Sequence, residues 1–426
     1  MKIKMVFRYV GIFILAGFWS QNVQAQEISI GGEFRISPVY SRGFRLPLYE
    51  GDKPGYYTLQ RTRLILNYDK ESDLKAEIIF QDRRYWGDES EGADAPTLTL
   101  YRGWVEKYIT PAFSIKLGRQ GLVYDDEYLF GEANWGGTRA HDAGLLKYET
   151  SGIKAHLGFA YNANKGELKR EHYESDFYKN LAFVWFNREI GKLNSSLIFI
   201  NRGLEREDTA VFYTQTFGTN TKLKLNDKLS LKGLYYHQLG KTLEEKDINA
   251  YFYSIQLNYD LNNYLSFTLG NDTGSGTDQS DAENAKFEKY NTFDRLYSLG
   301  HGHFGYLDYF YVKVPTTSGV QDYYFKSQIT INKKFSIKEH VHGFFTQANI
   351  NDPNNDNMYL DKYLGIENDI ILNYKFSPNF KASLGHSIMF GTETLDEFMG
   401  GGESAESQFF YAVITATPNF FKSTIK

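Results

Sequence analysis

The segment from Thr58 to Gln120 alternates between apolar and polar side chains in four consecutive pieces. Because successive side chains of a β-strand point to opposite faces, Leu64 and Leu66 belong to one face and Arg61 and Arg63 to the other. The next piece repeats the pattern, with a polar face made of Lys75, Glu77, Gln81 and Arg83. A soluble sandwich would bury its apolar face and expose its charges. Here the charged faces fall in register on neighbouring strands, which favours a barrel with lipid outside and water inside.

This pattern fixes the register of the second strand. Arg61 and Arg63 are expected to face water, and Leu64, Leu66 and Tyr68 to face lipid. A slip of one residue would exchange the two faces, and an arginine at the bilayer midplane costs roughly 2–4 kcal/mol. The 33 Tyr and 33 Phe agree with this interpretation, because a membrane barrel needs aromatic rings at both interfaces.

The connections between the alternating runs also follow a pattern, short ones taking turns with long ones. The short connections lie at 69–72, 110–111, 150–152, 190–192, 226–228, 262–263, 333–334 and 377–379. Such a rhythm is typical of periplasmic turns and extracellular loops, and it requires an even strand count when both termini are periplasmic. The sequence therefore predicts an all-β fold, a transmembrane antiparallel β-barrel of about 18 strands.

One segment, Tyr306 to Val314, could itself be a strand. Counting it would reverse the short and long rhythm, so it is assigned to one long extracellular loop from about Gly274 to Val320. An aromatic loop of this length is costly to expose to water. We therefore expect it to fold into the lumen as a constriction, with the polar side chains His301, His303 and Asp308 placed opposite the arginines and paired with them.

The N-terminus has the pattern of a secretory signal. Three basic residues precede the apolar run from Val10 to Trp19, and Val23 and Ala25 are small residues where a signal peptidase reads. The run is shorter than the ~20 residues of a spanning helix, which disfavours a membrane anchor. The domain prediction is a signal peptide at 1–25 and a single barrel at 26–426. The chain has no Cys, which excludes disulfides, thiol catalysis and cysteine-ligated metals.

Six basic side chains lie on the polar faces of the first strands, with Glu33, Glu77 and Glu106 among them. We call them the basic set: Arg35, Arg61, Arg63, Lys75, Arg83 and Arg102. One hypothesis is a track for anionic or hydroxyl-rich solutes, because guanidinium groups bind carboxylates through two parallel hydrogen bonds. The other is a ladder of Arg–Glu pairs that neutralises a wet wall. The two hypotheses are compatible.

Metal and calcium sites are not predicted. His301 and His303, like His340 and His342, are spaced to share one strand face and could bind a metal. No Cys or carboxylate cluster has matching spacing, so polar lumen residues are the favoured interpretation. Two acidic loop clusters, Asp352–Asn354–Asp356 and Asp125–Asp126–Glu127, leave loop calcium as a minor alternative; the first of them lacks the Gly and the Glu of a calcium loop. No cofactor is expected.

Enzymatic activity is not predicted either. Ser298, His301 and Asp308 lie close together in sequence, but proximity in sequence is not the geometry of a triad. The chain also has no GxSxG elbow.

Several motifs, in their order along the chain, resemble the alginate export family of outer-membrane porins. They are QRTRLILNY, QDRRYWGDE, KLGRQGLVYDDEYLFGEANW, RAHDAGLLKY, RLYSLGHGHFGYLDYF and a C-terminal strand ending in PNFFK. The resemblance implies an eighteen-strand barrel with an electropositive lumen. It also implies that Arg139, His141 and Asp142 face the lumen or its rim, whereas the strand parity of Arg119 allows an outward position.

The function expected is a passive channel of the bacterial outer membrane, surrounded by lipid and with an arginine-rich, partly plugged lumen. Its solutes would be anionic or polar, with alginate or another oligosaccharide among the candidates, and no nucleic acid is expected to bind. Export and uptake both need such a barrel, so the direction and the oligomeric state stay open. The alternative is an adhesin or structural barrel with a closed lumen, which would show no conductance.

Overall fold

A computed structural model describes residues 26–88, 98–132, 135, 139–164, 166, 169, 171–173, 177–280, 289–310, 317–355, 358–400, 402 and 407–425. The expected signal peptide, 1–25, lies outside these residues. Within the described residues, no helix is both long enough and apolar enough to cross a membrane.

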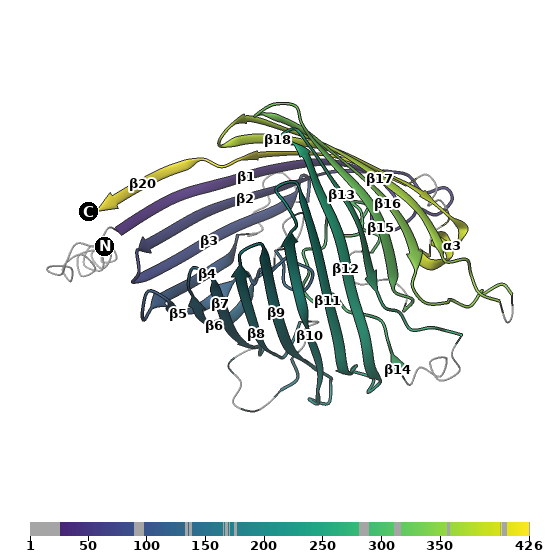
Figure 1. Cartoon of the computed structure of the whole chain (residues 1–426), viewed down its shortest axis with the longest axis horizontal. Helices are drawn as coiled ribbons and strands as arrows, with labels where there is room; N and C mark the ends of the chain where they lie inside the picture. Colours follow the sequence, from purple (N-terminus) through teal and green to yellow (C-terminus); the bar gives the residue numbers. More distant parts are fainter. Residues whose placement is uncertain are drawn as a thin grey trace, which may run out of the picture.

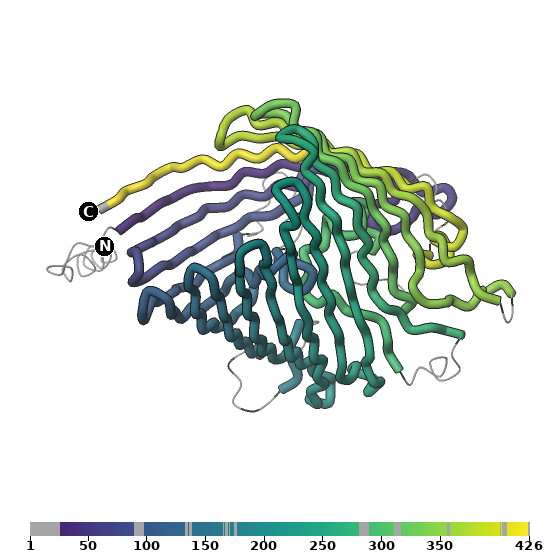
Figure 2. The backbone as a smooth tube through the Cα atoms, viewed as in Figure 1, coloured from purple at the N-terminus to yellow at the C-terminus, as the bar shows by residue number. Residues whose placement is uncertain are grey.

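One antiparallel sheet closes into a barrel (Figure 1). Its strands are β1 (Gln26–Arg42), β2 (Gly55–Lys70), β3 (Leu74–Tyr85), β4 (Thr99–Tyr108), β5 (Phe113–Gln120), β6 (His141–Glu149), β7 (Ile153–Tyr161), β8 (Asn180–Ile190), β9 (Leu193–Glu205), β10 (Val211–Lys224), β11 (Leu229–Lys241), β12 (Asp247–Asn262), β13 (Leu265–Gly274), β15 (Val320–Thr330), β16 (Phe335–Thr346), β17 (Tyr363–Ser377), β18 (Phe380–Gly391), β19 (Gln408–Ala416) and β20 (Asn419–Ile425). Each strand pairs with the next, and β1 closes the ring against the end of the chain. Figure 2 shows this closure, with the first and last strands side by side.

The wall has 18 strands, as the sequence predicts. β19 and β20 count as one strand, because both pair with β1 and only Thr417 and Pro418 interrupt them. Proline has no backbone N–H to donate to a sheet, which accounts for the interruption. The two-residue strand β14 (Lys289–Tyr290) pairs with β12 in parallel and is not part of the wall, since β13 pairs directly with β15.

Short turns lie at one end of the barrel and long loops at the other, and all eight short connections fall where the sequence places them. The long loops are L1 (43–54), L2 (86–98), L3 (121–140), L4 (162–179), L5 (206–210), L6 (242–246), L7 (275–319), L8 (347–362) and L9 (392–407). L9 contains the only helix of the described residues, α3 (Glu393–Met399). Thr392 caps this helix by accepting a hydrogen bond from Leu395 N, and Gly400 ends it in the left-handed conformation.

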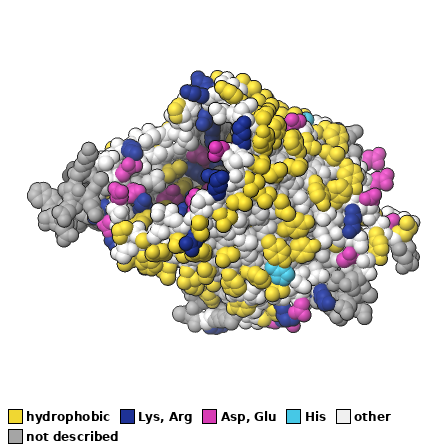
Figure 3. Space-filling view, viewed as in Figure 1, with side chains coloured by type: hydrophobic (Ala, Val, Ile, Leu, Met, Phe, Trp, Pro, Cys, Tyr) yellow, Lys and Arg dark blue, Asp and Glu magenta, His cyan; other side chains and the backbone are white. Residues whose placement is uncertain are grey.

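The alternation of side chains resolves into an apolar outside and a charged inside. Leu64 is 41% exposed on the outer face, while Arg61 and Arg63 are 4% and 8% exposed on the inner face. The predicted register of β2 is therefore confirmed. Figure 3 shows apolar side chains spread over the outer surface, and Lys, Arg, Asp and Glu gathered in a hollow.

Among the described residues, those of L3 and L7 fold deep into the lumen. L7 does so as predicted: Leu307, Tyr309 and Phe310 are buried, and residues 306–310 form no strand; the remainder of the ambiguous segment, 311–314, lies outside the described residues. L3 also folds inward, which was not predicted from the sequence. The aromatic and aliphatic side chains of both loops join the inner faces of the wall strands in one apolar cluster.

Backbone hydrogen bonds join L3 to L7. Tyr297 N donates to the Leu129 carbonyl at 2.9 Å, and the Tyr297 carbonyl accepts from Gly131 N at 2.8 Å. Gly131 is required at this crossing, because a Cβ there would lie 2.6 Å from the backbone nitrogen of Leu299. The two loops thus form one body that narrows the lumen.

Candidate functional site

The basic set lies on the inner face of four adjacent strands, β1 to β4. Sheet register places Arg35 directly opposite Arg61, and Arg61 directly opposite Arg83. Three guanidinium groups therefore form one row across three strands, which we call the arginine row. Like charges placed directly opposite one another destabilise a sheet, so this row is not what a purely neutralising ladder would contain.

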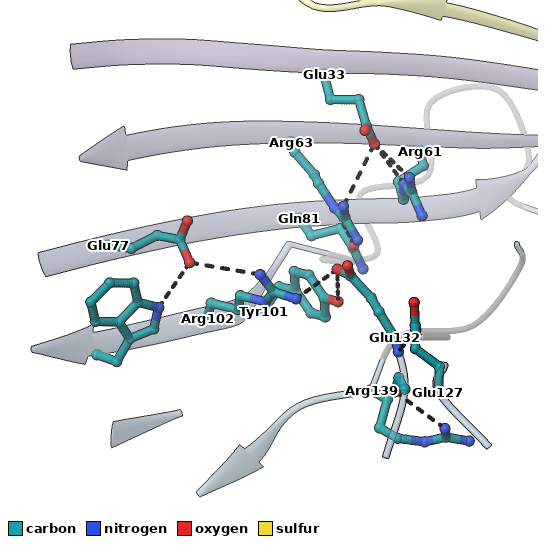
Figure 4. A network of polar contacts seen from close by, with 12 residues as sticks. Glu33, Arg61, Arg63, Glu77, Gln81, Tyr101, Arg102, Glu127, Glu132 and Arg139 are labelled. Carbon is teal, nitrogen blue, oxygen red and sulfur yellow. Dashed lines mark hydrogen bonds and ion pairs between the residues drawn. The ribbon is translucent and has the colours of Figure 1, made fainter. Parts of the chain in front are cut away.

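Carboxylates compensate part of this charge (Figure 4). Glu33 accepts a hydrogen bond from Arg61 Nε at 2.8 Å and lies 3.7 Å from Arg63. Arg63 also donates to Gln81 at 2.8 Å and lies over the Tyr101 ring, 4.3 Å from its centroid. These contacts fix the two buried arginines of β2 in place.

A β-bulge brings Arg102 into the same network. Ile79 pairs with Arg102 and Phe80 with Leu100, so Tyr101 is the extra residue of β4. Arg102 points inward and binds Glu132 of L3 at 2.6 Å, with Glu77 3.8 Å away (Figure 4). L3 is therefore attached to the arginine wall by a charge pair.

Trp135 of L3 marks the point where the lumen narrows. The guanidinium of Arg35 lies over its ring, 5.1 Å from the centroid, and His301 of L7 stacks on it at 4.4 Å. Two neighbouring cavities share Arg35, Arg61 and Trp135 in their lining, and the larger has a volume of about 280 Å³. The larger cavity also has amide, hydroxyl and amino groups in its lining, from Asn373, Ser383, Thr415, Lys338 and Lys381. The smaller cavity also includes Arg83.

Two members of the basic set take little part in the ion pairs around Trp135. Lys75 lies away from the narrowing, and Arg83 makes no strong ion pair there among the described residues. Lys75 binds Asp69 at 3.1 Å, near the short-turn end of the barrel. Arg83 is exposed on the inner face and donates to the Tyr85 hydroxyl at 3.4 Å.

The three residues that the resemblance places at the lumen or its rim do not share one position in the structure. Arg139 donates to the backbone carbonyls of Tyr297 and Ser298, so it joins L3 to L7 instead of presenting its charge to the lumen. His141 faces inward and contacts the Tyr178 hydroxyl at 3.0 Å. Asp142, at the loop end of β6, faces outward and not into the lumen.

Arg119, on the strand beside Asp142, binds it at 2.8 Å on the outer face. The outward position that strand parity allows for Arg119 is therefore confirmed.

The predicted pairing between L7 and the basic set is wrong. Asp308 binds His301 at 2.8 Å and lies 3.9 Å from Arg45 of L1, and no ion pair joins it to the basic set among the described residues. The physical reason is that Trp135 lies between His301 and Arg35. His303 is half-buried against the Tyr128 ring, with 4.1 Å between the ring centroids, and loss of solvation lowers its pKa well below the ordinary value.

Sequence reasoning missed a second charged wall, which lies beneath L7. We call it the acidic wall: Asp272 of β13, Asp322 of β15, and Glu367 and Asp369 of β17, all at most 3% exposed. Asp272 accepts hydrogen bonds from Tyr128 of L3 and from Tyr324. Glu367 Oε1 accepts the backbone N–H groups of Tyr306 and Leu307 at 2.6 and 2.8 Å. The alternation Ile366–Glu367–Asn368–Asp369–Ile370 was a signal for this wall.

The other candidate sites do not assemble as one centre. Ser298 Oγ is buried and has no hydrogen-bond partner, so the His301–Asp308 pair is not extended into a catalytic triad. In the acidic cluster of L3, Asp125 binds Trp185, Asp126 binds Asn220, and Glu127 accepts Glu132 N.

In the L8 cluster, Asp352 accepts hydrogen bonds from Asn354 N and Asn355 Nδ2, while Asp356 lies outside the described residues.

Solved structures with the same fold include an outer membrane protein and a porin. OprD from Pseudomonas aeruginosa aligns with TM-score 0.62 at 11% identity, over 92% of this chain and 94% of OprD. A BenF-like porin from Pseudomonas fluorescens gives TM-score 0.62 at 8% identity, over 92% and 99% of the two chains. OccK11 from P. aeruginosa gives 0.57 at 10% identity, over 94% and 96%.

Comparison of the sequence with curated proteins gave no match. The family model described as alginate export matches residues 26–404, which is most of the chain. The barrel, its porin neighbours and this match show that the chain belongs to the alginate export family of bacterial outer-membrane β-barrels.

Proposed function

We propose that this protein is a passive outer-membrane channel that selects anionic and polar solutes at the arginine row. The observation that supports this most is the cross-strand register of Arg35, Arg61 and Arg83 beside two cavities. Like charges in one row lower the stability of the sheet at that point. Such a loss of stability is expected where the charged side chains bind a solute.

The local charge balance supports an anionic solute. Among the described residues, five guanidinium groups, of Arg35, Arg61, Arg63, Arg83 and Arg102, lie with three carboxylates, of Glu33, Glu77 and Glu132. A narrow space with low-dielectric walls and surplus positive charge raises the local concentration of anions. Guanidinium groups also bind carboxylates with directional, bidentate hydrogen bonds.

The solute class follows from combining this charge with the rest of the cavity. Asn373, Ser383 and Thr415 offer amide and hydroxyl groups on the neighbouring strands β17, β18 and β19, and Thr415 pairs directly with Arg35. Acidic oligosaccharides carry both carboxylates and hydroxyls, and the family name points to alginate, a polymer of uronic acids. We therefore favour uronate oligosaccharides, which would pass the barrel without chemical change.

A closed barrel that acts as an adhesin or structural protein is the second candidate. The observation in its favour is the extent to which L3 and L7 fill the lumen with aromatic side chains. The two candidates differ in conductance, because a closed barrel passes no ions.

Single-channel recording in planar lipid bilayers tests the proposal. We expect an open channel whose reversal potential in a salt gradient shows anion preference, and block by uronate oligomers but not by neutral oligoglucans of equal length. The double variant Arg35→Gln/Arg61→Gln should lower the anion-to-cation permeability ratio by about threefold or more. Arg206→Gln, which removes an arginine bound to Asp208 in L5, is the matched control. Absent conductance would favour the closed barrel, and a conductance without anion preference would contradict the role of the row.

A further inference from the structure

Three side chains with metal-ligating atoms meet on the inner face of β16 and β17. They are His340, His342 and Asp369, and one ligand atom from each lies within 4.8 Å of the other two. Sheet register explains the meeting, since His340 pairs directly with Asp369 and His342 is two residues further along the same face. Asp369 is 29 positions or fewer from both histidines in sequence, but only strand pairing brings it to them.

The environment of His342 resembles that of a histidine prepared to bind a metal. Its Nδ1 lies 2.9 Å from both carboxylate oxygens of Asp322, which accept the Nδ1 proton. Nε2 then carries the free lone pair; it is buried, has no hydrogen-bond partner, and lies 3.8 Å from Asp369 Oδ2. Metal-binding histidines usually donate their second N–H to a carboxylate in this way, which fixes the tautomer and the ring orientation.

The other two side chains also have buried polar atoms without partners. Asp369 is 0% exposed, and neither of its carboxylate oxygens makes a hydrogen bond of normal geometry, although Ser387 and Glu367 lie beside it. His340 Nδ1 is likewise buried without a partner. Buried polar atoms of folded proteins are normally paired, so three such side chains around one point indicate a missing ligand.

The charged side chains around these three residues are compatible with a bound cation. Glu367 lies beside Asp369 on the same face of β17, and two neighbouring buried carboxylates repel each other when both are ionised. Lys326, the cross-strand neighbour of His340, directs its amino group over the Tyr324 ring at 4.4 Å. No ion pair joins it to Asp369 among the described residues.

We propose that His340, His342 and Asp369 bind a divalent first-row transition metal, with Zn²⁺ as the probe of choice. Two imidazoles and one carboxylate suit zinc and its neighbours, whereas calcium and magnesium prefer all-oxygen sites. Three protein ligands leave a further position for water. This site goes beyond the proposed channel function and does not depend on the identity of the solute.

The position of the site also suggests what a bound metal would do. Glu367, next to Asp369, holds the backbone of Tyr306 and Leu307, and the His340 ring lies 5.7 Å from the Tyr306 ring. A cation would relieve the repulsion between Glu367 and Asp369 and fix the His340 ring. Metal binding would therefore stabilise the docked form of L7.

Zinc titration of the purified barrel, without a histidine tag and after treatment with a chelator, tests the proposal. A chromophoric competitor measures affinity, and elemental analysis measures stoichiometry. We expect one Zn²⁺ per chain in the native protein and at least about tenfold weaker binding in His342→Ala and in Asp369→Asn. Asp322→Asn should weaken binding by about 10–100-fold although it changes no ligand.

The controls separate this site from other histidines and from misfolding. His237→Ala removes a histidine that contacts Tyr235 on the outer face of β11, and it should bind zinc like the native protein. Asp369→Asn is nearly isosteric and removes a buried charge, so the folded barrel should persist, as a heat-dependent gel shift would verify. No zinc binding by the native protein, or equal binding by the Asp369→Asn variant, would overturn the proposal. Preference for Ca²⁺ over Zn²⁺ would also overturn it.

Discussion

The two charged walls of this lumen are built from the same kind of strand but hold their charges differently. On β1–β4, the arginine row lines cavities, and its partners are other side chains. On β13–β17, the acidic wall lies beneath L7, and Glu367 is 0% exposed with loop backbone as its partner. Strand register decides which charges share a row, while the inward loops decide which of them a solute can reach.

The difference depends on how each loop approaches the wall. L3 contacts the arginine side through Glu132 and the edge of the narrowing through Trp135, which leaves cavity space beside Arg35. L7 approaches the acidic side with its backbone. Gly305 has a φ of 78°, and a Cβ there would collide with the Glu367 carboxylate. Because Gly305 has no Cβ, the backbone of L7 can lie directly against Glu367 and cover the acidic wall.

Removing the part of L7 that covers the acidic wall should change the difference between the two walls most. Replacing Leu299–Phe310 by a short Gly-Ser linker uncovers the acidic wall, so we expect a several-fold rise in single-channel conductance and weaker anion preference. The barrel should still assemble, because none of these residues belongs to a wall strand. Shortening the exposed L8 turn at 352–355 is the control. Unchanged conductance in a folded variant would show that L7 is not the constriction.

A matched pair of substitutions should have an intermediate effect. Glu367→Ala leaves the N–H groups of Tyr306 and Leu307 buried without an acceptor, at about 1–3 kcal/mol for each donor. Glu33→Ala instead removes a carboxylate that pairs with Arg61 beside a cavity, so it should raise anion preference and leave L7 docked.

Trypsin cleavage after Arg295 measures docking, because this residue of L7 is only 5% exposed. Cleavage should accelerate in Glu367→Ala and stay at the native rate in Glu33→Ala. Equal cleavage rates in the native protein and in both variants would contradict the proposal that the acidic wall, and not the arginine row, holds L7 in place.

The smallest expected effect is that of pH on the docking of L7, through protonation of His303. Burial lowers the pKa of His303 well below 6.5, and the charges of Arg295, Lys326 and Lys232 lower it further. The undocked loop therefore takes up a proton near pH 6.5 that the docked loop does not. Docking is fully stable above that pH and weakens as the pH falls below it, by up to about tenfold in the docking equilibrium per pH unit.

Single-channel records between about pH 7.5 and 5 would show this as more frequent openings in acid. Other groups also titrate in this range, so the informative quantity is the difference between the native protein and His303→Phe. The phenyl ring can keep the contact with Tyr128 but takes up no proton. Identical pH profiles would rule out His303 as the group responsible.

The sequence alone determined the wall of this barrel. Alternation gave the faces of β2, the short and long connections gave the strand count, and the same parity placed Tyr306 in a loop. These inferences succeeded because they depend on the period of two and on the cost of placing charge in lipid, which are local properties of the chain.

Only the tertiary structure decided how the lumen is organised. Trp135 of L3 came between L7 and Arg35, and Asp308 consequently found His301 and Arg45 as partners. Asp369 likewise reached His340 through strand pairing, although sequence spacing offered no carboxylate to the histidines. The physical reason is that the path of a long loop depends on the whole inner surface that it buries, whereas a strand face depends on the alternation of its own residues.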